Sequence, residues 1–223
     1  MMDVIASRQV EKAGRDYQVL IEKPRCVGEL EFACRWSAVD DAGIVVGSHD
    51  AHGEDTAAAL MYAVLSVGIR LGPEFTYSGE EYAGFPRFQP ADGPGRPGSY
   101  FFHLPMNDGL REEAVQAEDA IASREPEKDG RKYQVLIEKP RRMSGSGFAC
   151  HWSVTDDIGV VVESREAYGE DSAAALICVV LSVGPCLGPK LTWFGEEGAG
   201  FPCCRPDESG KSGSWFPPFA DKF

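Results

Sequence analysis

The sequence predicts an α+β fold made of two homologous domains in tandem. Residues 17–25 (YQVLIEKPR) recur as residues 133–141, an offset of 116 residues. The offset holds without a gap from Asp3 to about Phe88, with roughly six in ten positions identical. Each copy also combines strand patterns with one helix pattern, and its length of about 100 residues is an ordinary domain size. Two copies of this length indicate two domains rather than a solenoid.

Strand patterns open each copy. Residues 16–23 form a β-rich run that Pro24 closes. Phe32, Cys34 and Trp36 then alternate with more polar positions, which is the period of a half-buried strand. The sequence Asp-Asp-Ala-Gly at 40–43 predicts a turn. We therefore expect residues 44–46 to begin the returning strand of a hairpin.

A helix is expected next. Its apolar stripe follows helical spacing and consists of Ala57, Leu60, Met61, Val64 and Leu65. Glu54 and Asp55 lie where the helix dipole favours anions, and Gly72 marks the end. Pro185 replaces Ile69 in the second copy, so that helix is expected to stop near Gly184.

Short strands are expected after each helix, at residues 75–77 and 191–193. The expected unit is thus β-β-β-α-β, one mostly antiparallel sheet packed on one helix. Residues 1–105 form the first domain and residues 126–223 the second, each with a Pro/Gly-rich tail that aromatic residues hold in place. Between them, residues 106–125 are expected to contain an acidic connector helix with an apolar seam of Leu110, Ala114, Ala117 and Ile121.

Composition and charge exclude several classes of protein. The chain has 22 Lys and Arg against 35 Asp and Glu, a net charge of −13, which disfavours binding to nucleic acid. It begins without an apolar signal segment and has no long apolar run, so no membrane association is expected. Seven cysteines without a CxxC spacing suggest neither a disulfide framework nor a zinc site. A reducing, cytoplasmic location fits these features.

The second half of each copy carries a recognisable pattern. It reads Gly169-Glu170-Asp171-Ser172-Ala173-Ala174-Ala175-Leu176, then Leu187-Gly188, Leu191-Thr192-Trp193 and Gly200-Phe201-Pro202. This pattern resembles a family of small bacterial α+β domains to which no function is assigned. The first copy matches it except that residues 75–77 (FTY) depart from Leu-Thr-Trp. In size, acidity and modularity the domains are also similar to immunity proteins of bacterial toxin systems.

No histidine is shared between the copies, which disfavours histidine catalysis common to both. His49 and His52 are spaced so that they could supply half of the ligands of a metal site, but the second copy has Arg165 and Tyr168 at these positions. Cys34 and its counterpart Cys150 lie in phase with apolar strand residues, as buried inert thiols do. No metal ligand set, cofactor motif or catalytic residue is predicted.

Acidic pairs are the remaining candidates. The pairs at 40–41 and 54–55 have structural explanations as a turn and a helix start. Glu80 with Glu81, and Glu196 with Glu197, have none, so we expect either solvated loops or a surface that binds a basic partner.

We therefore expect a non-catalytic acidic binding protein, most concretely an immunity-type inhibitor of a basic toxin or effector, steered by charge. Two alternatives remain: an assembly module whose copies pack as a pseudo-dimer, and a carboxylate-dependent hydrolase. A binder should expose an acidic or aromatic surface, whereas an assembly module should bury matching surfaces of its two copies against each other.

Overall fold

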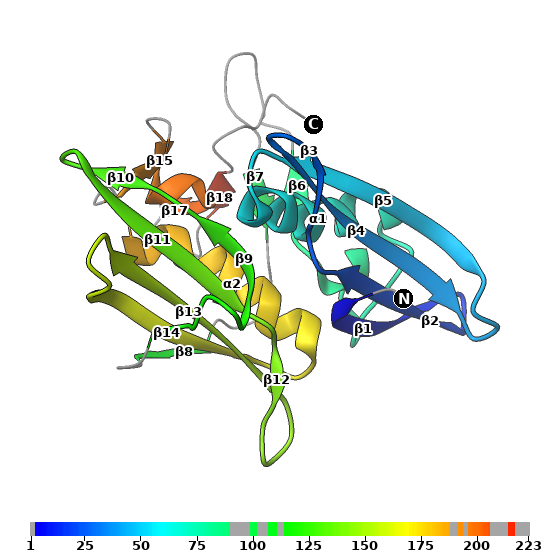
Figure 1. Ribbon diagram of the computed structural model, residues 1–223. Helices are drawn as coiled ribbons and strands as arrows, with labels where there is room; N and C mark the ends of the chain where they lie inside the picture. The colour runs from blue at the N-terminus through cyan, green and yellow to red at the C-terminus, as the bar shows by residue number, and fades with distance from the viewer. Residues whose placement is uncertain are drawn as a thin grey trace.

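The computed structural model shows an α+β fold with two helices and antiparallel sheets (Figure 1). It describes residues 3–89, 99–101, 107–110, 114–187, 191–193, 196–205 and 214–216. We refer to residues 3–89 as the first half and to residues 119–205 as the second half. The two helices lie between the two larger sheets (Figure 1).

The sheet of the first half contains five strands. They are β1 (Val4–Lys12), β2 (Arg15–Glu22), β3 (Arg25–Gly28), β4 (Glu31–Asp40) and β5 (Val45–Gly53). β2 pairs with β1 and β4, and β4 pairs in turn with β3 and β5. The predicted hairpin between β4 and β5 is confirmed: the Asp40 carboxylate accepts the N–H groups of Ala42 and Ile44, and Gly43 has φ = 79°.

The sheet of the second half repeats this arrangement and adds a strand. It contains β9 (Ala120–Arg124), β10 (Glu127–Lys128), β11 (Arg131–Glu138), β12 (Arg141–Arg142), β13 (Phe148–Asp156) and β14 (Val161–Gly169). The register is the same at an offset of 116: Tyr17 faces Asp40, and Tyr133 faces Asp156. The additional strand, β8 (Asn107–Leu110), pairs with the outer edge of β14.

Two expectations about strand content were wrong. Three strands were expected before each helix, but β1 and β3 also precede α1, and β9, β10 and β12 also precede α2. The acidic connector helix at residues 106–125 is absent from the described part of that segment, which contains β8 and β9 instead. Its apolar spacing fits a helix, yet Ile121 and Ala122 are buried in strand β9, where pairing with β11 outweighs the weak helical seam.

The two helices are α1 (Thr56–Leu71) and α2 (Ser172–Leu187). Asp55 caps α1 by accepting the Ala58 N–H at 2.6 Å, and Asp171 accepts the Ala174 N–H at 2.6 Å. The expected end of α2 near Gly184 was wrong, because the helix continues through Pro185 to Leu187. Pro185 lies in the last turn of α2, so the N–H that it lacks falls close to the end of the helix.

The segments after the helices are short hairpins. Tyr77 and Glu80 exchange two backbone hydrogen bonds of 2.9 Å around Ser78 and Gly79, and the 3₁₀ turn η1 (Tyr82–Gly84) follows. In the second half, β15 (Thr192–Trp193) pairs with β16 (Glu196–Glu197), before the turn η3 (Gly198–Gly200).

Strands from the two tails form a third, shared sheet. Its order is β17 (Cys203–Arg205), β18 (Ser214–Phe216), β7 (Ser99–Phe101) and β6 (Arg87–Gln89). Because β18 of the second tail pairs with β7 of the first, the tails join the two halves through backbone hydrogen bonds.

The core is one apolar cluster that includes residues of both halves. Trp36 and Trp152 are its largest side chains, with exposed fractions of 1% and 0%, and Trp36 thus lies on the buried face that the alternating pattern of its strand predicts. The Trp36 indole N–H also donates to Ser66 Oγ at 3.0 Å.

Two reciprocal arginine–aspartate contacts join the halves. Arg8 of β1 binds Asp171 through two hydrogen bonds of 2.9 and 3.2 Å. Arg124 of β9 binds Asp55 in the same way, at 2.9 and 3.1 Å. Both arginine side chains are fully buried. Each aspartate is also a helix cap, so each half supplies the cation that lies against the helix start of the other half.

Adjacent hydroxyl groups complete this interface. Ser172 at the start of α2 accepts the Ser7 N–H at 2.8 Å and donates to the Ser7 carbonyl at 3.1 Å. Thr56 of α1 makes the matching pair of contacts with Ser123, at 2.7 and 3.2 Å. Some backbone N–H and C=O groups of the edge strands β1 and β9 therefore form hydrogen bonds with the helix of the opposite half.

Candidate functional site

The two halves differ most clearly at one sheet edge. In the second half, β8 pairs with residues 165–168 of β14 and covers its outer edge. Among the described residues, no strand pairs with the corresponding edge of β5. An exposed strand edge presents unpaired N–H and C=O groups and accepts another extended segment readily. The surface beside β5 is therefore the candidate site.

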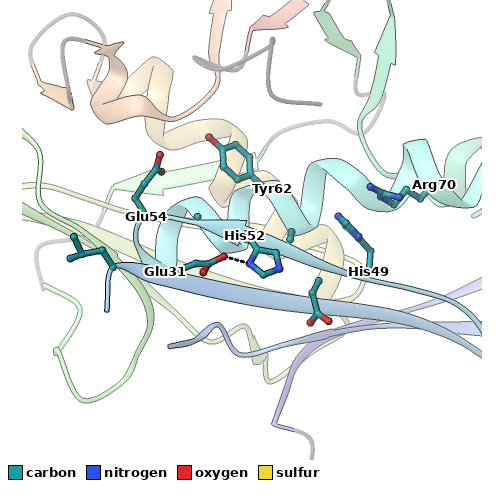
Figure 2. Close-up of a pocket in the computed structure, with 10 residues that line it drawn as sticks. Glu31, His49, His52, Glu54, Tyr62 and Arg70 are labelled. Carbon is teal, nitrogen blue, oxygen red and sulfur yellow. Dashed lines mark hydrogen bonds and ion pairs between the residues drawn. The ribbon is translucent and has the colours of Figure 1, made fainter. Parts of the chain in front are cut away.

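A groove of about 480 Å³ runs along this edge, between β5 and α1 (Figure 2). We call it the β5 groove. Its lining residues are Leu30, Glu31, His49, Asp50, Ala51, His52, Gly53, Glu54, Tyr62 and Arg70. The counterparts of His49 to His52 are residues 165–168, which pair with β8, and β8 also contacts α2.

Charge is distributed unevenly along the β5 groove. Glu31 and Glu54 lie toward one end, and His49 with Arg70 lies at the other (Figure 2). His52 Nδ1 is 2.6 Å from Glu31 Oε1. Burial, and next the Arg70 charge, lower the pKa of His49 below 6.5. Neutral His49 beside a permanent cation thus contrasts with the carboxylates at the opposite end.

Asp50 points from the outer face of β5 and is already compensated. It accepts hydrogen bonds from Arg25 and from Arg35, at 2.9 and 2.7 Å. Burial acts to raise the pKa of this carboxyl group, but the two arginines outweigh it and the pKa is lowered. Asp50 therefore stays ionised and paired with the two arginines, and Glu31 is bonded to His52, whereas Glu54 is a further carboxylate that lines the groove beside Tyr62.

The His49 and His52 pair does not form a metal centre here. Their side chains project from opposite faces of β5 because the positions are three residues apart. Within the described ranges there is no group of three or more His, Cys, Asp or Glu side chains close enough to hold a metal ion.

The predicted acidic pairs lie elsewhere. Glu80 and Glu81 are exposed in the hairpin that follows α1, and Glu196 and Glu197 form β16. The hairpin itself has a structural role, because Tyr77 stacks 4.2 Å from the Arg8 guanidinium and donates to Glu170 at 3.1 Å. The structure does not bring these pairs into the β5 groove, and their role in binding stays a prediction.

A second cavity, of about 360 Å³, lies on the outer face of the second sheet. Near it, His151 Nε2 is 2.8 Å from Ser164 Oγ, and His151 Nδ1 is 3.6 Å from Glu138. This order of groups is that of a serine hydrolase triad. However, Ser164 is only 3% exposed and does not line the cavity. The first half has Ser48, Arg35 and Glu22 at these positions, so only one half carries the arrangement.

The two matched cysteines are buried as expected. Cys34 and Cys150 donate to the carbonyl groups of Glu22 and Glu138, each at 3.2 Å. Burial raises the pKa of both thiols well above its usual value, and the neighbouring glutamates add to the effect. The paired residues Cys203 and Cys204 lie in β17, and their side chains are outside the described set.

Comparisons with known proteins assign no family. No family model matches the chain, and no curated protein matches it. One similar solved structure is an acyl-ACP thioesterase from Bacteroides thetaiotaomicron, with 10% identity over 76% of each chain and a TM-score of 0.14. A likeness this weak carries no argument about fold or function. In the parts of the chain that the structure describes, no helix is long and apolar enough to cross a membrane.

Sequence reasoning did not identify the buried arginines or the β5 groove. Arg8 and Arg124 were detectable, because Ile-Ala-Ser-Arg at 5–8 recurs at 121–124. The groove had a weaker signal: the two copies differ at seven of its positions, namely Leu30, Glu31, His49, Asp50, His52, Tyr62 and Arg70, although Asp50 is replaced only by a second acidic residue, Glu166.

Proposed function

We propose that the chain is a non-catalytic binding protein built by tandem duplication as an internal pseudo-dimer. The observation that carries the pseudo-dimer part of this proposal is the reciprocal pair of contacts, Arg8 with Asp171 and Arg124 with Asp55. The arginine of each half binds the aspartate of the other half, so the same contact occurs twice, as it does across the two-fold interface of a homodimer. This burial of matching surfaces is the property expected of an assembly module.

The pseudo-dimer leaves its outer surfaces available for a partner. A net charge of −13 attracts a cationic protein over a Debye length of about 8 Å at physiological salt and accelerates association. Immunity-type inhibition of a basic toxin or effector, in a cytoplasmic setting, remains the concrete form that we propose for this binding. The acidic pairs at Glu80 and Glu81, and at Glu196 and Glu197, would steer the partner.

Hydrolysis is the weaker alternative. Its strongest support is the order Ser164, His151, Glu138. A nucleophile must reach substrate, whereas Ser164 is buried and bonded within the sheet. We therefore propose a structural role for this polar cluster: the Ser153 hydroxyl next to it accepts the Val115 N–H at 2.8 Å and holds the segment around Val115 against the sheet.

Association kinetics test the proposed binding. The chain is used to capture its partner, and the association rate constant is measured at about 50 and 500 mM salt, a range over which screening lengths shorten severalfold. We expect the wild-type rate to fall strongly with salt. Reversal of Glu80 and Glu81 to Lys should slow association and weaken that dependence, with little change in dissociation.

A matched control is the reversal of Asp16 and Glu29 to Lys, which makes the same change in net charge at exposed positions of the first half. Equal effects of the two double variants would show that net charge, and not the loop, steers binding. A rate that does not vary with salt, or a partner that is itself acidic, would overturn the proposal.

A further inference from the structure

The β5 groove is the first-half counterpart of a slot that the second half fills with its own chain. In the second half the filling strand is β8, whose residues 107–110 face residues 168–165 of β14 in antiparallel register. The two edge strands are equivalent, because β5 and β14 have the same register with β4 and β13. The equivalent edge of β14 thus holds an extended segment of four residues.

We propose that the β5 groove binds an extended segment of a basic partner protein, which adds to the sheet as an antiparallel strand beside β5. This inference rests on the proposed function, since it names how the basic partner is held. Backbone hydrogen bonds would supply affinity and the side chains of the groove would supply specificity, as in other cases of strand addition.

The register of β8 gives the expected positions of the segment. Its four residues would face His52, Ala51, Asp50 and His49 in that order, by analogy with Tyr168, Ala167, Glu166 and Arg165. Directly opposed residues of two strands point to the same face, with their Cβ atoms about 5 Å apart. The residue opposite Ala51 therefore points toward α1, into the part of the groove that Glu54 and Tyr62 line.

Charge selects the side chain at that position. A Lys or Arg opposite Ala51 would meet the Glu54 carboxylate and the aromatic ring of Tyr62, two favourable contacts for a cation. An acidic residue there would be repelled by Glu54. At the other end, Arg70 disfavours a second cation opposite His49. The groove thus fits a segment with one basic residue near its start and a neutral or acidic residue two positions later.

The test uses a peptide whose strand geometry the structure already contains. The probe is the blocked peptide of residues 105–112 (PMNDGLRE), which includes β8, in its native form and with Asp108→Lys. Residue 108 is the one that would face Ala51. We expect the Lys peptide to bind about tenfold more tightly, which corresponds to about 1.4 kcal/mol. Shifts of the backbone amide signals of residues 49–52 during titration report binding and its location.

Three variants make the result specific. Glu54→Gln should remove the preference for the Lys peptide, whereas Glu170→Gln, at the matching position of the second half, should retain it. A peptide that also carries Gly109→Pro should bind weakly to all forms, because proline cannot donate to a strand ladder. Equal binding of the Lys and native peptides, or shifts confined to other strands, would overturn the inference.

Amide hydrogen exchange without peptide identifies other occupants. An open edge predicts faster exchange in residues 49–52 than in residues 165–168. Equal protection in the monomer would mean that another part of the chain already covers β5, and protection that rises with protein concentration would mean that a second copy does. Either result overturns the inference. If the captured partner binds equally well to wild type and Glu54→Gln, the groove inference fails while the proposed function stands.

Discussion

Replacement of Arg8 by Ala should be among the most destabilising single changes in the chain. Arg8 is fully buried and binds Asp171 through two hydrogen bonds. It also donates to the carbonyl groups of Ala83 and Gly84, at 3.2 and 2.8 Å. Removal of one member of a buried ion pair typically costs about 3–5 kcal/mol, because the remaining charge is left without its partner.

The structure narrows this range. The Asp171 side chain keeps 20% of its exposure, so water can partly solvate it after the change. It also retains its hydrogen bond to the Ala174 N–H. We therefore place the loss in free energy of unfolding at the lower end, at about 3 kcal/mol. Arg124→Ala should behave alike, since Asp55 is 21% exposed and caps α1 in the same manner.

Urea denaturation measures this loss, and exposed Arg15→Ala serves as the control, with an expected change within about 0.5 kcal/mol. A double-mutant cycle isolates the pair: Arg8→Met is combined with Asp171→Ser, since serine preserves the helix cap. We expect a coupling energy of at least about 1 kcal/mol.

Cooperativity provides a second readout. Because each arginine joins two halves, the wild type should unfold in one transition. A loss below about 1 kcal/mol for Arg8→Ala, where about 3 is expected for a buried pair, would refute the reasoning. Two separate transitions in the wild type would refute the linkage between the halves.

Three further predictions concern the core and the groove. Trp36→Ala should lower the free energy of unfolding by about 3–5 kcal/mol in urea, because its site is 1% exposed, and a loss below about 1 would contradict its core role. Iodoacetamide at pH 8 should modify exposed Cys26 in the native protein but not buried Cys34, as peptide mass spectrometry would report, and equal labelling would speak against this burial. NMR titration should give His49 a pKa below 6.5, and Arg70→Gln should raise that pKa. Because the pKa of His49 is lower in the folded wild type than in the unfolded chain, the unfolded chain binds the proton more readily. The contribution of His49 to stability is therefore complete above pH 6.5 and decreases as the pH falls toward the lowered pKa.

Local features of the fold could be predicted from the sequence because local chemistry determines them. The turn at Asp40 and Gly43, the strand of Trp36 and the cap at Asp55 each depend on residues close in sequence. The α+β class followed from these elements. Strand β9 was missed because its residues also satisfy a helical spacing, and its partner β11 lies outside that window.

The candidate site depends on relations between distant residues. Arg8 and Asp171 are 163 residues apart, and a single arginine in a strand does not indicate what it will contact. Among the described residues, β8 covers one of two equivalent edges, and the β5 groove lies along the other. Sequence comparison of the copies shows equal strands at both edges, and only the three-dimensional path of residues 107–110 distinguishes them.

The long separation of Arg8 from Asp171 also affects the order of events during synthesis. Asp171 leaves the ribosome after a further 163 residues, which takes roughly 8–30 s at about 5–20 residues per second. Asp55 at the start of α1 waits only 69 residues for its partner Arg124. The Arg124–Asp55 contact can therefore form before Asp171 of α2 is available to Arg8. Until translation passes residue 171, the nascent first half holds an apolar surface and a cation that are later buried. We expect this interval to be when the protein most depends on chaperones.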